Sequence, residues 1–238
     1  MGMTANSTAE NLAQVTLLRE RISAMQRRRA TPETLPVPGP LSPVFPDGGL
    51  RTGAAYSLAR GETGLMLALL AEASAAGSWC CVIGVPELSV GAAEGHGIDL
   101  SRLVLIPTPQ ERWMQAAAAA CEVFPLVALR PGRRPTQADA QRLEAKMRDR
   151  GSSLLALGEW PGAEGTVSAG EDEWVGIGRG HGLISGRAMT VSMHGRRTPH
   201  PRSVRVMLPG PSGGVEAVAA AQARPLESGG ATLRAVGS

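Results

Sequence analysis

The chain has 238 residues and a formal net charge of +3 at pH 7, and it contains 30 glycines and 18 prolines. This length accommodates one sizeable domain with appended segments. The three cysteines, Cys80, Cys81 and Cys121, have no C-x-x-C spacing, which excludes the common zinc and dithiol redox motifs. The N-terminus lacks an apolar signal core and no long apolar run occurs, so we expect a soluble, cytoplasmic protein.

Residues 8–29 have the pattern of an amphipathic helix. The apolar stripe consists of Leu12, Val15, Leu18, Ile22 and Met25. Their three- and four-residue spacing places them on one helix face, which must be buried somewhere. Residues 30–46 contain six prolines, which predicts an extended linker. Residues 1–29 are therefore predicted to be an arm that docks on a partner or another copy, with packing on the chain's own core as the alternative.

Residues 47–208 form the predicted core, in which short apolar runs alternate with helical segments. Strands are expected at residues 53–59, 79–84, 103–106, 126–129 and 153–157. Helices are expected at residues 65–75, 110–121 and 136–150, the last with Thr136 as its N-cap. This alternation predicts an α/β fold, with a mostly parallel sheet and flanking crossover helices.

The C-terminal part of the chain has a different pattern. Two further strands are expected at residues 183–193 and 204–208, joined by a basic hairpin at 194–202. Gly, Ala, Ser and Pro dominate residues 209–238, which are predicted to be a mostly disordered, flexible tail. A short helix at residues 215–223 is the one element expected within it.

A strand, a glycine turn and a helix at residues 55–70 stand where a phosphate-binding loop would be. In the pattern G-x-x-x-x-G-K-[ST], the lysine binds phosphate and the hydroxyl group holds Mg²⁺. The aligned residues are Ala59, Arg60, Gly61, Glu62, Thr63, Gly64, Leu65 and Met66. Leucine and methionine replace the lysine and the hydroxyl residue, so we expect no nucleotide binding. Gly61 and Gly64 are expected to have a structural role, because they let the strand turn into its helix.

A second element of nucleotide chemistry is also missing. One core strand of such a domain ends in an acid that positions Mg²⁺. Here Leu126–Leu129 is followed by Arg130, a cation. The chain is therefore predicted not to be an enzyme, and to use no cofactor and no metal.

Two other patterns do not support a catalytic or metal site. Residues 210–214 match the G-x-S-x-G elbow of hydrolases, but no histidine follows Ser212, so a triad in that order cannot be completed. The four histidines are His96, His181, His194 and His200. They lack metal-ligand spacing and are interpreted as surface or hydrogen-bonded side chains.

No acidic residue occurs between Trp174 and Val215. The basic residues in this interval include Arg187, Arg196, Arg197, Arg202 and Arg205. Such a group can contact nucleic acid or an acidic partner, or it can be an ordinary solvated surface. Both interpretations are open at this point.

The sequence resembles the RecA superfamily over residues 45–209. Residues 47–53 resemble the family's G-G-[IL]-P-x-G entry to the first core strand, and residues 97–103 resemble its L-G-[VI]-D-x-x-x-L segment. The resemblance implies two DNA-binding loops. The first is reduced to residues 130–135, and the second, residues 160–174, carries four acidic side chains that would repel phosphate. RecA-type DNA binding is therefore not expected.

A RecA-like domain with a degenerate phosphate loop, a helical arm and a flexible tail is similar to ImuA-type proteins, particularly the actinobacterial form. The resemblance implies an accessory role in the SOS response to DNA damage, in mutagenic translesion synthesis. The implied partners are ImuB, an inactive relative of Y-family polymerases, and an error-prone DnaE-type polymerase. The arm would contact ImuB or another copy. The alternatives are a SulA-like inhibitor of cell division that binds FtsZ, and a nucleic-acid-binding module.

Overall fold

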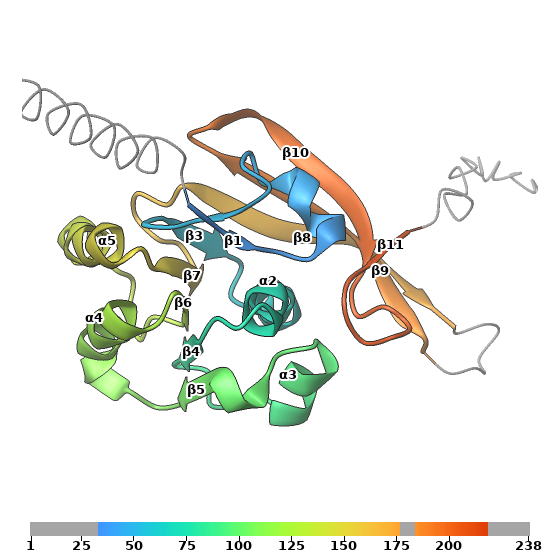
Figure 1. Cartoon of the computed structure of the whole chain (residues 1–238). Coiled ribbons are helices and arrows are strands. Elements are labelled where there is room, and N and C mark those ends of the chain that lie inside the picture. The colour runs from blue at the N-terminus through green and yellow to red at the C-terminus, as the bar shows by residue number, and fades with distance from the viewer. Residues whose placement is uncertain (1–32, 177–183, 219–238) are drawn as a thin grey trace, which may run out of the picture.

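A nine-stranded mixed sheet runs through the molecule, as seen in this computed structural model (Figure 1). The structure describes residues 33–176 and 184–218. In spatial order the strands are β11 (Glu216–Ala217), β10 (Thr198–Met207), β9 (Gly186–Gly195), β8 (Gly165–Val175), β3 (Ala55–Leu58), β7 (Ser153–Leu157), β6 (Leu126–Leu129), β4 (Cys80–Ile83) and β5 (Leu103–Ile106). The predicted N-terminal helix and its apolar stripe lie outside the described residues.

Six adjacent strands of this sheet, β8, β3, β7, β6, β4 and β5, pair in parallel. The four innermost of them are continuous apolar or small-residue runs, and every residue of β6 is fully buried. Runs of this kind fit strands that are covered on both faces, because neither face has to be polar. The predicted mostly parallel sheet with flanking helices is confirmed.

Helices cover the two faces of the parallel strands. Helix α2 (Thr63–Ala75) lies on one face, and α4 (Trp113–Val123) and α5 (Gln137–Arg150) lie together on the other (Figure 1). The short α3 (Val90–Gly95) and the 3₁₀ turns η2 (Leu100–Arg102) and η3 (Gln110–Arg112) complete the connections.

Helix α5 begins where the sequence predicted. The Thr136 hydroxyl accepts a hydrogen bond from the Asp139 amide at 3.2 Å, and the Asp139 carboxylate accepts one from the Thr136 amide at 3.0 Å. This reciprocal capping box satisfies two amide donors of the first turn. The helix has Gly151 as its C-cap, in a left-handed conformation with φ of 69°.

The proline-rich segment differs from the extended linker that its composition predicted. Strand β1 (Thr34–Pro36) pairs antiparallel with β2 (Gly49–Arg51), and the 3₁₀ helix η1 (Gly39–Val44) packs against β9 and β10. Leu41, Val44 and Phe45 are at most 1% exposed. Proline is compatible with edge strands and short 3₁₀ turns, so residues 33–46 belong to the core rather than to a linker.

The glycine-rich entry motif of residues 47–53 has a structural explanation. Gly48 and Gly53 have left-handed φ angles of 74° and 75°, a conformation that favours glycine. A Cβ added at Gly49 would collide with the Leu35 carbonyl oxygen in the β1–β2 pair. The motif therefore forms strand β2 and the turn that leads into β3.

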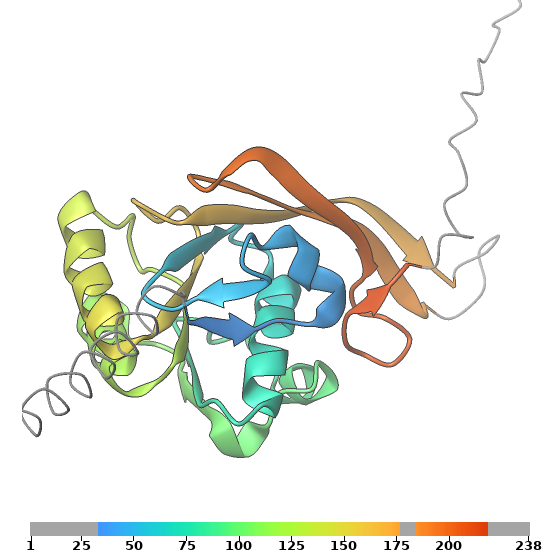
Figure 2. The same ribbon diagram turned by 45° about the horizontal axis from the view of Figure 1, so that its top comes forward.

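Strands β8, β9 and β10 form an antiparallel extension that curves over η1 (Figure 2). Val167, Met189, Val191, Met193 and Val206 on its inner face are all at most 1% exposed. Most of residues 160–174, expected as a long loop, are therefore part of strand β8. The predicted hairpin at 194–202 is also shorter, because β9 continues to Gly195 and β10 begins at Thr198.

The start of the predicted tail is also ordered within the fold. Residues 216–217 form strand β11 against β10, where a helix was expected. The Glu216 carboxylate accepts hydrogen bonds from the amide and hydroxyl of Ser212 at 2.9 and 2.5 Å. Residues beyond 218 lie outside the described part. Among the described helices, none has the length and apolar character that crossing a bilayer requires.

Candidate functional site

The carboxyl ends of the parallel strands meet at a topological switch point. Strand β3 continues into α2 on one face of the sheet, whereas β6 continues into α5 on the opposite face. Because the two connections diverge, a crevice opens beyond the strand ends, and ligands of open α/β sheets bind in such crevices. The degenerate loop and Arg130 both lie at this edge.

The loop between β3 and α2 has no lysine and no hydroxyl group to offer a phosphate at the two key positions. Leu65 is 1% exposed and Met66 is fully buried, so both side chains belong to the core. Neither Gly61 nor Gly64 has a left-handed φ, and a Cβ added at either would meet no atom within 4 Å. The prediction that the turn needs these two glycines is therefore wrong, since other residues fit the same backbone.

Glu62 is the N-cap residue of α2, although its side chain makes no capping hydrogen bond. Burial raises the pKa of this carboxyl group, and the nearby Arg187 opposes the rise. The positive end of a helix dipole ordinarily attracts phosphate. Here that end has a carboxylate of the chain beside it, which disfavours a second anion.

Arg130 stands where an acid would hold Mg²⁺ in an active nucleotide site. Its guanidinium group forms an ion pair with Glu87, which follows β4. A hydrogen bond from its own amide lowers the pKa of Glu87, and the contact with Arg130 lowers it further. The backbones also approach closely here: Gly84 has a φ of 78°, and a Cβ on it would lie 2.5 Å from the Arg130 carbonyl oxygen.

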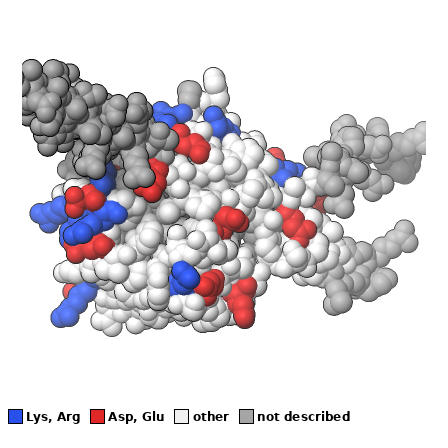
Figure 3. Space-filling view, in the orientation of Figure 1, with Lys and Arg blue, Asp and Glu red and all other residues white. Residues whose placement is uncertain are grey.

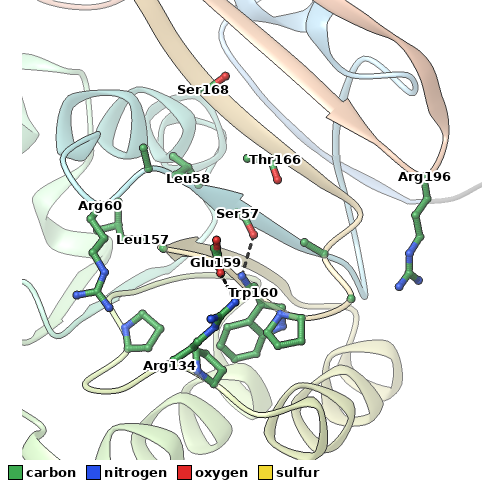
Figure 4. Close-up of a pocket in the computed structure, with 17 residues that line it drawn as sticks. Ser57, Leu58, Arg60, Arg134, Leu157, Glu159, Trp160, Thr166, Ser168 and Arg196 are labelled. Atoms are coloured by element: carbon green, nitrogen blue, oxygen red, sulfur yellow. Dashed lines mark hydrogen bonds and ion pairs between the residues drawn. The ribbon is translucent and has the colours of Figure 1, made fainter.

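A pocket of about 850 Å³ lies beside the loop, on the α5 side of β3 and β8 (Figure 4). Its lining combines serine and threonine hydroxyls, apolar and proline side chains, three arginines and one glutamate. The charged residues are Arg60, Arg134, Arg196 and Glu159. The pocket is lined by Ala59 and Arg60 of the degenerate loop but not by the residues that begin α2.

The wall of the pocket formed by residues 158–163 is fixed by backbone contacts. The Gly158 amide donates to the Leu58 carbonyl at 2.7 Å, and the Trp160 amide donates to the Ser57 hydroxyl at 3.0 Å. Gly158 has a φ of 129°, which favours glycine. The wall is therefore held to the end of β3.

The predicted basic group is mostly paired within the chain. Arg187 binds Asp172, Arg197 binds Asp47 at 2.6 Å, and Arg205 binds Glu173 at 3.1 Å. Arg202 donates to the Phe45 carbonyl at 3.4 Å. Figure 3 shows acidic and basic side chains interspersed on the visible face. Of the five, only the Arg196 side chain lacks an ion pair or hydrogen bond among the described residues, so the group is not a continuous cationic surface.

The structure separates the residues that the sequence singled out. Ala59, Gly61 and Gly64 are exposed at the switch point, whereas Leu65 and Met66 lie in the core. Of the predicted arginine group, only Arg196 lines the pocket. The pocket residues Arg60, Arg134 and Trp160 were not predicted as a site. Each of these residues lies in a segment that follows a core strand, and this position was the signal that could have indicated a site.

The histidines and other potential metal ligands form no cluster of three in the described residues. His194 and His200 are exposed, and His96 is half-buried, where burial lowers its pKa. His181 lies outside the described part.

The segment that resembles L-G-[VI]-D-x-x-x-L is structural. The Asp99 carboxylate accepts hydrogen bonds from the Ser101 amide at 3.0 Å and from Arg102 at 3.1 Å. Arg102 in turn donates to the Gly77 carbonyl at 2.6 Å. These contacts tie the turn before β5 to the end of α2 rather than forming a ligand site.

Comparison with solved structures gives the class of protein. The chain has the fold of the RadB recombinase, with a TM-score of 0.54 over 77% of this chain and 98% of that one, at 14% sequence identity. The fold is thus RecA-like.

Comparison of sequences then gives the family. Residues 43–162 match the family described as the MT3502 N-terminal domain. The chain is also 33% identical, over 158 residues, to Uncharacterized protein Rv3395c of Mycobacterium tuberculosis (strain ATCC 25618 / H37Rv), a match that covers 66% of this chain and 72% of that protein. The chain belongs to the MT3502 N-terminal domain family.

Proposed function

We propose that this protein is a non-catalytic RecA-like adaptor of the ImuA type, which supports translesion synthesis after DNA damage by binding other proteins. The observation that carries the proposal is the replacement of the phosphate-binding and metal-binding side chains at the switch point. Leu65 and Met66 are buried in the core, and Arg130 is paired with Glu87. A RecA-like fold with those features has no lysine, hydroxyl group or acid where ATP and Mg²⁺ would need them.

The proposed partner is an ImuB-type inactive relative of Y-family polymerases, which would link the adaptor to an error-prone DnaE-type polymerase. The ion pairs of Arg187, Arg197 and Arg205 favour protein binding over direct DNA binding, because cations that are already paired within the chain contribute less to phosphate contacts. Any weak contact with DNA would then be secondary. The apolar stripe at residues 12–25 is the proposed docking element, in contact with ImuB or another copy.

Size-exclusion chromatography of the full chain with the ImuB-type protein tests this proposal. We expect co-elution, with Leu18→Glu weakening the complex about tenfold, since it places a charge on the apolar stripe. Gln14→Glu, off the stripe, is the matched control. A truncation for the same assay should begin after residue 218, because Glu216 and β11 belong to the fold. Absence of a complex with the unaltered chain would overturn the proposal.

A further inference from the structure

The pocket beside the degenerate loop has the features of a binding site that nucleotide chemistry does not account for. Its volume, about 850 Å³, falls within the usual range for ligand sites. Leu58, Leu157 and Pro131 supply apolar lining, and hydroxyl groups lie on strands β3 and β8. An occupant with an apolar middle would therefore bury surface against these walls.

Two arginines lie on opposite sides of the pocket, with the Arg134–Glu159 ion pair between them. In Figure 4, Arg60 and Arg196 lie on opposite sides of the cavity. Arg60 lies against Gly158, and Arg196 lies near Gly162. Within the described residues neither guanidinium group forms an ion pair, whereas Arg134 is paired with Glu159 at 2.6 Å. An occupant that satisfies both free arginines must carry negative groups at both of its ends.

The lining favours a peptide over single-stranded nucleic acid. Nucleic acid in such a groove needs aromatic faces on which its bases can stack. Trp160, the aromatic residue of the lining, is only 4% exposed, so its ring faces offer little stacking surface. The arginine fork binds carboxylates and phosphates alike with two parallel hydrogen bonds, so the buried Trp160 ring is the feature that favours a peptide.

The undescribed segments of this chain are poor candidates for the occupant. Residues 1–32 contain two glutamates against five arginines, and residues 219–238 contain one glutamate against two arginines. Residues 177–183 have no acidic side chain. In residues 1–32, Glu10 and Glu20 do flank an apolar stretch, but that stretch is the stripe already assigned to the other docking contact. The other two segments have too few acidic side chains to place one at each end of an apolar stretch.

We propose that this pocket binds an extended peptide of a partner protein, in which acidic residues flank a short apolar stretch. One carboxylate binds Arg60, another binds Arg196, and the apolar residues between them pack on the leucine and proline walls. The proposal rests on the adaptor role, and it assigns that role a second docking site, separate from the stripe at residues 12–25.

Fluorescence anisotropy with the full chain tests this site directly. The probe is a labelled peptide with paired glutamates at both ends and leucines between them. The control peptide has glutamines in place of the glutamates, and labelled oligothymidylate tests nucleic acid. We expect the glutamate peptide to bind at least about tenfold more tightly than the glutamine peptide, with an affinity that falls as salt is raised.

The protein variants locate the binding. Arg60→Ala and Arg196→Ala should each weaken binding about tenfold, and Arg134→Ala less, because Glu159 already pairs with Arg134. Arg142→Ala, an exposed arginine of α5 outside the pocket, is the matched control. Circular dichroism checks that each variant is folded.

Three results would overturn the peptide site. The first is equal affinity for the two peptides. The second is an affinity of the Arg60→Ala and Arg196→Ala proteins that equals the affinity of the Arg142→Ala protein. The third is binding of oligothymidylate and of neither peptide. The ImuB-type protein is absent from this assay, so a negative result removes the pocket proposal and leaves the adaptor role to its own test.

Discussion

Arg130 and Glu87 form an ion pair that joins the carboxyl ends of β6 and β4 at the switch point of the sheet. The cation occupies the place of the acid that binds Mg²⁺ in active relatives of this fold. Its carboxylate partner is 57% exposed, so the pair lies near solvent. The contact therefore changes the chemistry of the edge more than the stability of the fold.

A small energetic role for this pair follows from its exposure. We predict that Arg130→Ala lowers the free energy of unfolding by less than about 1 kcal/mol, the usual range for solvent-exposed ion pairs. Urea denaturation of the two single variants and the double variant with Glu87→Ala measures the coupling. A coupling energy of several kcal/mol would mean that the pair holds the two strand ends together.

The glycines of the degenerate loop should be replaceable. Gly64→Ala is predicted to stabilise the protein by up to about 1 kcal/mol, because alanine favours the helix and a Cβ meets no atom there. Gly61→Ala should be close to neutral for the same steric reason. Thermal denaturation of both variants is the measurement. A loss of more than about 2 kcal/mol would contradict the open space around these residues.

Gly84 should behave in the opposite way. Its φ of 78° is strained for any other residue, and a Cβ would lie 2.5 Å from the Arg130 carbonyl oxygen. We predict that Gly84→Ala destabilises the protein by about 1–3 kcal/mol, as expected for a residue forced into such a conformation. The Gly64→Ala protein is its control in the same denaturation series. Unchanged stability of Gly84→Ala would contradict the strained conformation.

The free energy of unfolding should depend on pH through Glu62, at the N-terminus of α2. Burial raises the pKa of Glu62 in the folded protein above its ordinary value of 4.5. Below pH 4.5 the carboxyl group is protonated in both the folded and the unfolded protein, and folding carries no cost from burying its charge. As pH rises through the folded-state pKa, the buried group becomes charged and the folded protein loses stability. Glu62→Gln should therefore raise the melting temperature at pH 7, and the difference should disappear near pH 4.

Glu72→Gln, at an exposed position of the same helix, controls for the change of net charge. If Glu62→Gln and Glu72→Gln shift the melting temperature equally at every pH, the desolvation of Glu62 plays no part.

The bounds of the innermost strands could be predicted closely because strands buried on both faces are continuous apolar runs in the sequence. Residues 126–129 and 153–157 are strands with the expected bounds. Strand β8 was not predicted because the resemblance to RecA implied a loop at residues 160–174. Arg187 and Arg205 on β9 and β10 neutralise the acidic side chains of β8 across the sheet, and no local pattern indicates that pairing.

The candidate site was only partly predictable. The loss of the lysine at position 65 is evident from the sequence, but the pairing of Arg130 with Glu87 depends on the order of the strands. The pocket could not be predicted from the sequence either, because Arg60 and Arg196 are far apart in the chain. They line one cavity only because β8 lies beside β3.

We propose that the RecA-like core has lost nucleotide binding and works through protein contacts. Isothermal titration calorimetry of the full chain with ATP and Mg²⁺ tests it most directly. We predict no heat beyond dilution, because Leu65 and Met66 offer phosphate and Mg²⁺ no lysine or hydroxyl group. Glu62 and Arg130 also place charges of the wrong sign for phosphate and metal. A saturable titration with micromolar affinity would contradict the account.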